Sequence, residues 1–450
     1  MKKITGIIAI LLFLQGSRSY GQTLTLPASA TDTTLQEADL QTCVDIALKN
    51  FPLIKQNQID QKITDAQIKS KIAEWYPQVN LNGSYQNTFQ RLTSISSIGG
   101  NLTTIVQGTY NTSAVQLGAT QNLFNRDALL ASKSAGDVRQ NTLNQLITNK
   151  IDLVANVTKA YYAILSLMQQ VRVLDEDIVR LQRSLKDSYN QYKAGVVDNT
   201  GYKQATISLN NSKAQKQGLE ATLPSYYALL KLYMNYPAEK EFTVHYDSLQ
   251  LDQMSALDTN QNVDYQKRIE YKTLTTNKRL LEANLKYEKW SYLPTVSLFA
   301  NYNLNYFSSR FSDLYKNNYP QSFAGVQVTM PLFQGGKRRE NIKVAQFNLD
   351  RNAWDFQNLQ NSVNQEYQTA ISAYKSDLAT YNATKENMQL AQEVYNTVDL
   401  QYRAGIKTYL DVITAETTLQ TSKINFTNAL FKLLSDKVDV QKANGSIQPN

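Results

Sequence analysis

The residue types that most often catalyse reactions or bind metal ions are scarce in this sequence. Histidine and cysteine each occur once, as His245 and Cys43, so neither a metal-ligand cluster nor a nucleophile beside a base is indicated. Gly335-Gly336-Lys337 comes nearest to a phosphate-binding loop, but it lacks the earlier glycine and the hydroxyl residue after the lysine. The sequence therefore predicts a protein that is not an enzyme and has no cofactor and no metal site.

The first residues have the pattern of a secretory signal peptide. Two lysines precede an apolar run over residues 4–14, and small residues stand before Gln22, as at a cleavage site. A retained anchor helix is disfavoured because the apolar run is too short to span a bilayer. We therefore expect a signal peptide at 1–21, an extended leader at 22–34, and export of the protein.

Charge and hydropathy argue against two further classes of protein, those that bind nucleic acid and those with membrane-spanning helices. The formal net charge of +8 is spread along the chain, whereas nucleic-acid binding usually needs a clustered basic face. After the signal peptide no stretch is apolar for the roughly 18 residues that a membrane helix needs. If the exported protein enters a membrane, it must therefore do so through β-strands.

Two very long helices are predicted from stretches that lack helix-breaking residues. Residues 128–194 contain no proline and one glycine, and residues 337–404 contain neither. In the second stretch apolar residues recur every ~3.5 positions, which is typical of coiled coils. Each helix would be about 100 Å long at the usual rise per residue.

Each long helix is expected to turn back at a glycine, Gly195 in the first and Gly405 in the second. The returning helices are predicted at 198–221, before a break at Pro224, and at 410–443. Both turns would lie at the same far end of the molecule. Several copies of such hairpins could form a hollow tube, and a solid coiled-coil stalk is the alternative.

Alternation of apolar and polar residues predicts two pairs of strands. The first pair is 77–92 with 113–124, and the second is 294–307 with 322–333. Residues 93–113 are rich in Ser, Gly, Thr and Asn and are interpreted as a long polar loop. One face of each strand is apolar and the other carries amides and hydroxyls, which suits a tilted crossing of a bilayer but also fits a soluble sheet.

Four strands are too few to close a membrane barrel. An open edge would leave backbone groups without hydrogen bonds in lipid, at several kcal/mol each. If these are membrane strands, closure must come from identical chains, and two copies would give eight strands while three would give twelve.

The sequence also repeats itself. Tyr192-Lys193-Ala194-Gly195-Val196 recurs as Tyr402-Arg403-Ala404-Gly405-Ile406, and Pro77 and Pro294 open matching strand pairs. A shorter helix is predicted before each pair, over 35–74 and over 264–290. A period this long indicates duplication of a half-domain rather than a solenoid. The predicted units are a first repeat at 35–233, an insert at 234–262, a second repeat at 263–445 and a tail at 446–450.

Two motifs carry a resemblance to a known family. They are Leu332-Phe333-Gln334-Gly335-Gly336 and Tyr402-Arg-Ala-Gly-Ile-Lys-Thr-Tyr-Leu-Asp-Val-Ile-Thr-Ala-Glu416. With the duplicated order of elements over about residues 35–445, they resemble the TolC family of outer-membrane efflux and secretion channels. The resemblance implies a mixed α and membrane-β fold: a homotrimer with a shared twelve-strand β-barrel, four strands from each protomer, and a long α-helical coiled-coil barrel in the periplasm. The insert 234–262 would then belong to an equatorial region.

The same resemblance implies a function and partners. It predicts a passive exit duct in the cell outer membrane, in a tripartite efflux or type I secretion system, gated at its periplasmic helix tips. The expected partners are outer-membrane lipid, a periplasmic adaptor protein and, indirectly, an inner-membrane pump. The alternative is a periplasmic adaptor or coiled-coil scaffold protein without a pore, which usually carries one hairpin rather than two.

Site residues at the tips are also implied by the resemblance. The turns Ala194-Gly195-Val196 and Ala404-Gly405-Ile406 are expected to dock the adaptor. Tyr402 and Lys407 match residues that hold the entrance shut, and Thr200 matches a hydrogen-bonding partner of that latch. Asp411 matches an acidic ring that would favour cations in the pore.

Two positions depart from the family pattern. Gly201 stands where an aspartate partner of the latch is expected, and Thr414 stands where a second acidic ring is expected. Lys407 also lacks the bidentate fork of the arginine that is frequent there. We therefore expect a closing network that is thinner or built differently. The second repeat should carry most of the gate, because the first has Val197 where the second has Lys407.

Overall fold

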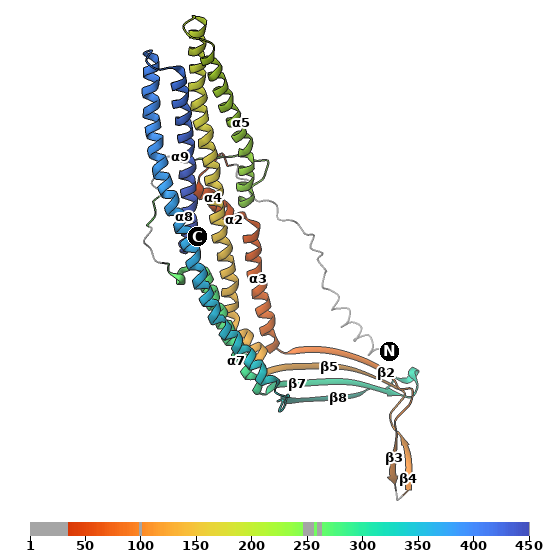
Figure 1. Ribbon diagram of the computed structural model, residues 1–450. Helices are drawn as coiled ribbons and strands as arrows, with labels where there is room; N and C mark the ends of the chain where they lie inside the picture. Colours follow the sequence, from red (N-terminus) through yellow and green to blue (C-terminus); the bar gives the residue numbers. More distant parts are fainter. Residues whose placement is uncertain (1–34, 99–100, 246–255, 259–262, 450) are drawn as a thin grey trace.

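The computed structural model describes residues 35–98, 101–245, 256–258 and 263–449. The predicted signal peptide and leader therefore lie outside the described residues, as does much of the predicted insert. Figure 1 shows an elongated molecule in which long helices stand side by side and a curved sheet leaves their lower end.

Two long hairpins dominate the helical part. Each joins a helix of 68 or 67 residues to a returning helix of 35 residues, α4 to α5 and α8 to α9. The α-helices are α2 (Leu40–Asn50), α3 (Pro52–Ile72), α4 (Arg126–Lys193), α5 (Thr200–Met234), α7 (Ile269–Lys289), α8 (Lys337–Arg403) and α9 (Tyr409–Ala443). The structure thus contains both long helices within two residues of the predicted ends.

The principal sheet is antiparallel, in the order β2-β5-β7-β8. Its strands are β2 (Gln78–Asn87), β5 (Asn111–Phe124), β7 (Thr295–Ser308) and β8 (Tyr319–Thr329). A short parallel bridge joins β1 (Glu37–Ala38), at the start of the first repeat, to β6 (Thr243–Val244), in the predicted insert. In the part of the chain that the structure describes, β2 and β8 each have a neighbour on one side alone, so the sheet has two open edges.

The two faces of this sheet differ in polarity, with Phe299 as an exception on the polar face. The register places Leu81, Leu117 and Tyr302 in one row across three strands, and all three are exposed. The adjacent row, on the opposite face, is polar and includes Gln116 and Asn303. An uncovered apolar face of this kind marks contact with lipid or with another chain.

Near the sheet, the helices lie side by side in the same order as the strands to which they connect. In the lower half α3 packs on α4, α4 on α7 and α7 on α8. In the upper half α4 packs on α9, so the two hairpins meet there, and α5 and α8 flank them. One chain therefore forms an open arc, with α3 and α8 at its two ends near the sheet.

The prediction of a polar loop at 93–113 is wrong. Strands β3 (Thr93–Ile98) and β4 (Asn101–Val106) pair as a hairpin that projects from the far end of the sheet (Figure 1). Ser and Thr made the segment look like a loop, but Thr, Ile and Val are also the β-branched residues that favour strands. Because β5 begins at Asn111, little of the segment remains as loop.

Several predicted boundaries are also wrong. Strand β2 ends at Asn87 rather than at residue 92. Helix α5 continues through Pro224 to Met234, where a break was predicted. Nearby side chains bond to backbone oxygens inside the helix, since Thr222 Oγ1 donates to Gly218 O and Ser225 Oγ donates to Thr222 O. Strand β8 ends at Thr329, so Leu332 and Phe333 lie beyond it rather than in the predicted strand 322–333. Pro331 has no N–H to donate to a ladder, which fits this earlier end.

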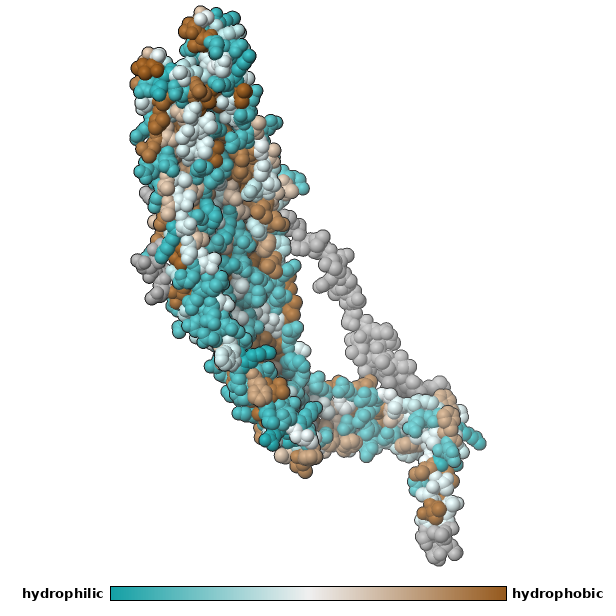
Figure 2. All heavy atoms as spheres, in the orientation of Figure 1, coloured by the Kyte–Doolittle hydropathy of each residue, from teal (hydrophilic) through white to brown (hydrophobic). Residues whose placement is uncertain are grey.

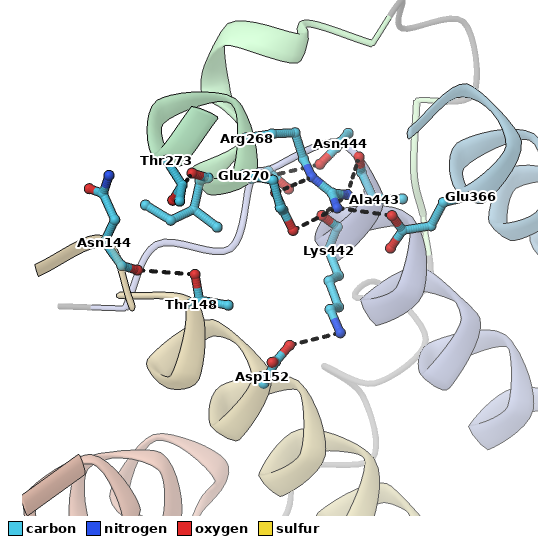
Figure 3. Close-up of polar contacts among 12 residues, drawn as sticks. Asn144, Thr148, Asp152, Arg268, Glu270, Thr273, Glu366, Lys442, Ala443 and Asn444 are labelled. Carbon is cyan, nitrogen blue, oxygen red and sulfur yellow. Dashed lines mark hydrogen bonds and ion pairs between the residues drawn. The ribbon is translucent and has the colours of Figure 1, made fainter. Parts of the chain in front are cut away.

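Arg268 joins the three helices α7, α8 and α9 of the second repeat. Its guanidinium donates to both oxygens of Glu270 and to Glu366, each at 2.9 Å. It also donates to the backbone oxygens of Lys442 and Ala443, at 3.1 and 2.9 Å, and so caps the C-terminal end of α9. Figure 3 shows these bonds converging on the buried guanidinium from α7, α8 and α9.

Replacing Arg268 should therefore loosen this junction. We expect Arg268→Ala to lower the free energy of unfolding by about 2 kcal/mol, because two carbonyl groups lose their charged donor. The midpoint of thermal denaturation in detergent measures the effect. Lys267→Ala is the matched control, since the neighbouring Lys267 is exposed and its ammonium lies 3.7 Å from Asp264 Oδ2. Equal midpoints for the two variants would contradict the role of Arg268.

Candidate gate at the helix tips

The two hairpin tips have the same backbone turn. Gly195 and Gly405 adopt left-handed backbone angles, φ +75° and +76°, which favour glycine. In each turn the next residue donates back to the helix, Val196 N to Gln191 O at 3.0 Å and Ile406 N to Gln401 O at 2.9 Å. Val196 is 72% exposed and Ile406 is 73% exposed. Hydrophobic atoms therefore lie on the surface at both tips, as Figure 2 shows.

Tyr402 links the second hairpin to the first. Its hydroxyl donates to Gln191 Oε1 at 3.1 Å, and Gln191 belongs to α4. The ring of Tyr402 lies 5.8 Å from the ring of Tyr409, measured between centroids. The predicted latch tyrosine thus contacts the first hairpin of the same chain.

Asp411 has a structural partner at the start of α9. The N-cap residue Thr408 accepts a hydrogen bond from Asp411 N, and Asp411 Oδ2 accepts from Thr408 N and Thr408 Oγ1, which makes a capping box. These bonds from Thr408 lower the pKa of the Asp411 carboxyl. Lys407 Nζ lies 4.0 Å from Asp411 Oδ1, and both side chains are exposed.

The remaining predicted residues lie at the start of α5. Thr200 begins the helix and donates its backbone N–H to Asp198 Oδ1 at 3.0 Å. Among the described residues no hydrogen bond or ion pair joins Thr200 to Tyr402 or Lys407. Gly201 faces the ring of Tyr409, since a Cβ atom at Gly201 would lie 3.3 Å from Tyr409 Cδ1. The structure therefore brings Tyr402, Tyr409 and Gly201 together, but not Thr200 and Lys407.

A buried charged cluster below the tips was missed in the sequence. Asp177 and Arg180 of α4 meet Glu416 of α9, with Arg180 Nε 3.4 Å from Glu416 Oε1. Ser212 of α5 donates to Asp177 Oδ2 at 2.7 Å, and Arg180 also donates to Asp177 Oδ1 at 3.2 Å. Glu416 is 2% exposed, and within the described residues neither of its oxygens accepts a well-aligned hydrogen bond.

One signal in the sequence could have found this cluster. Glu416 interrupts the apolar side of α9, between the buried Ala415 and Leu419. Burial, and then the charge of Asp177, raise the pKa of the Glu416 carboxyl to about 7, although Arg180 opposes them. Burial also raises the pKa of Asp177. With Asp399 and Tyr395 of α8 nearby, two buried carboxyl groups share one guanidinium between the hairpins.

The stability of the hairpin contact should therefore depend on pH. Between pH 4.5, the ordinary pKa of Glu, and pH of about 7, the folded protein keeps the Glu416 proton that the unfolded chain has lost. Stability should fall as pH rises through this window and stay level above it. We expect a lower midpoint of thermal denaturation at pH ~8 than at pH ~5. Glu416→Gln should flatten this dependence, and Glu393→Gln, at an exposed position of α8, should not. An unchanged pH profile in Glu416→Gln would contradict the prediction.

Comparisons with known proteins identify the class. Among the residues that the structure describes, no helix is both long and apolar enough to pass through a membrane. A model of the family described as "Outer membrane efflux protein" matches residues 43–234 and 276–446. The chain belongs to this family of outer-membrane efflux channels, and the predicted resemblance to the TolC family is confirmed.

Relatives and solved structures agree with the family. The outer membrane protein TolC of Salmonella enteritidis is 20% identical over 438 residues, which cover 94% of this chain and 85% of the relative. The toluene efflux pump outer membrane protein TtgC of Pseudomonas putida is 22% identical over 418 residues, covering 90% and 82%. Among solved structures, CusC has a TM-score of 0.71 at 18% identity, covering 92% of this chain and 93% of CusC. The CmeC outer membrane channel of Campylobacter jejuni has a TM-score of 0.67 at 17% identity, covering 90% and 85%.

Proposed function

We propose that three copies of this chain form a passive exit duct across the outer membrane, gated at the helix tips. The observation that carries the proposal is the four-stranded sheet with two open edges and an uncovered apolar face. Three such sheets joined edge to edge give twelve strands, enough for a barrel with a polar lumen. The amide face, with Gln116 and Asn303, would line that lumen, and the row of Leu81, Leu117 and Tyr302 would face lipid.

The end helices of the arc also support closure by further copies. Helix α3 exposes Ile59 and Ile63, one turn apart, and helix α8 exposes Val344, Phe347 and Trp354 along its lower half. Because α3 and α8 stand at opposite ends of the protomer, these two apolar stripes can meet only between copies. Burial of large apolar side chains is a main source of stability in permanent assemblies.

The duct would work with two partners. Relatives are described as the outer-membrane proteins of an antibiotic efflux pump and of a toluene efflux pump. We infer that this chain likewise receives its cargo from an inner-membrane pump, which supplies the energy, through a periplasmic adaptor. The adaptor would dock on the turns around Gly195 and Gly405, where Val196 and Ile406 offer exposed apolar contacts. A periplasmic adaptor or scaffold protein, the alternative, has no comparable observation in its favour.

Recording from purified protein in planar bilayers tests the proposed function. We expect discrete current steps, of small conductance if the proposed gate holds the tips closed at rest. We also expect recovery of the protein in outer-membrane fractions as an oligomer that dissociates on heating. A protein that inserts and gives no current steps, or that fractionates with soluble periplasmic proteins, would overturn the proposal.

The acidic ring leads to a separate prediction. Three Asp411 side chains at the narrow entrance should bind polyvalent cations. We expect Asp411→Ala to weaken block of the current by a trivalent cation. Thr408→Val is the control, because it breaks the capping box and keeps the carboxylate. Equal block in the wild-type protein and in Asp411→Ala would remove Asp411 from the pore.

A further inference from the structure

We propose that Tyr409 is the residue that fastens the two hairpins of one protomer together at the tips, seated in a notch that Gly201 leaves in α5. The inference deepens the proposed gate and rests on it. Tyr409 was not among the predicted site residues. It is the first residue of α9, and it is partly buried although its neighbours Thr408 and Leu410 are exposed.

The contacts of Tyr409 reach all three other tip helices. Its hydroxyl accepts a hydrogen bond from Ser184 Oγ of α4 at 3.0 Å. Its ring lies against Gly201 of α5 and 5.8 Å from the ring of Tyr402 of α8. The side chain thus stands at the point where the first and second hairpins meet. Opening the tips by moving one hairpin away from the other must withdraw this ring.

The notch explains why position 201 is glycine. The backbone of Gly201 is not left-handed, so its conformation alone does not require glycine. A methyl group there would already lie 3.3 Å from Tyr409 Cδ1, and a larger side chain would displace the ring. Gly218, in the same helix, has no atom within 4 Å of its Cβ position among the described residues. Gly201 therefore makes room for Tyr409, where the family pattern predicts an aspartate.

The nature of the link sets its response to salt. A latch made of opposite charges weakens as ionic strength rises, because salt screens exposed charges. A ring seated in a notch, with its hydroxyl bonded to uncharged hydroxyls of α4, does not weaken in this way. We therefore expect the fraction of time that the pore spends open to stay constant between low and high salt.

A pair of cysteines tests the contact directly. The Cβ position of Gly201 lies 3.9 Å from Tyr409 Cβ, within the range that a disulfide spans. The variant Gly201→Cys with Tyr409→Cys should therefore cross-link α5 to α9 when oxidised, and the native Cys43 is buried elsewhere. The oxidised channel should stay closed. After reduction, with the ring gone, the open fraction should exceed that of the wild-type protein by about tenfold. Gly218→Cys with Tyr409→Cys is the matched control and should not cross-link.

A larger side chain at position 201 gives an independent test. Gly201→Leu should raise the resting conductance, whereas Gly218→Leu, which makes the same replacement in the same helix, should leave it unchanged. Gel mobility of the oligomer confirms assembly of each variant.

The outcomes separate this inference from the proposed function. The role of Tyr409 is overturned if the Gly201/Tyr409 cysteine pair does not cross-link. It is also overturned if the cross-link forms but the conductance is equal in the oxidised and reduced states. In both cases the wild-type protein still conducts, so the proposed function stands. If the wild-type protein and every variant fail to conduct, the proposed function falls, and cross-linking alone still decides whether the two residues meet.

Discussion

Tyr402→Ala combined with Lys407→Ala is expected to raise the conductance of the protein in planar bilayers. The double variant removes the bond from the Tyr402 hydroxyl to Gln191, which joins α8 to α4, and the contact of the Tyr402 ring with Tyr409. A hydrogen bond of this kind contributes about 1 kcal/mol. The ring contact lies within the second hairpin and positions Tyr409, so loss of the bond that joins the hairpins should shift the open fraction of each protomer by about fivefold or more.

Single variants separate the contributions of the two residues to this increase in conductance. Tyr402→Phe removes the hydroxyl and keeps the ring, so it should give part of the increase. Lys407→Ala should give the smaller share, because the exposed pair with Asp411 is 4.0 Å apart and such pairs contribute well under about 1 kcal/mol. A double variant that remains as closed as the wild-type protein would remove both residues from the gate.

Phe347→Asp combined with Trp354→Asp is expected to prevent assembly. Phe347 is 66% exposed and Trp354 is 70% exposed, on the end helix α8. Burial of each ring against a neighbouring copy would stabilise the assembly by roughly 2 kcal/mol. A carboxylate buried at the same place would instead carry a desolvation penalty of several kcal/mol.

Sedimentation in detergent measures this second prediction. The double variant should sediment as a single chain, and the wild-type protein as an oligomer. Val179→Asp is the control, since Val179 is also exposed but lies on α4, which has helices of its own chain on both sides. If the double variant assembles as fully as the control, the apolar stripe of α8 is not an interface between copies.

The long elements could be predicted from sequence because their signals are local. A helix such as α8 needs an unbroken run without glycine or proline, and its end needs a glycine that can take a left-handed turn, as Gly405 does. The strands needed alternation over ten or more residues, as in β7. The β3–β4 hairpin escaped prediction because its Ser and Thr residues are equally frequent in loops.

The candidate gate could be predicted only in part, because its contacts join distant segments. The tip glycines and Tyr402 follow from motifs. The notch between Gly201 and Tyr409 does not, since these residues are far apart in sequence and meet only when the hairpins pack. The same holds for Asp177 and Glu416, whose burial depends on α4 and α9 lying side by side. Glycine at position 201, where the family pattern has aspartate, is therefore explained by the space that the Tyr409 ring occupies rather than by the loss of a charge.

Whether identical chains close the open sheet is tested most directly by the native mass of the purified protein in detergent. Closure of the four-stranded sheet into a twelve-strand barrel predicts a mass of three chains, with no stable monomer at micromolar concentration. A stable single chain, or an assembly of two, would contradict the duct proposed for this protein.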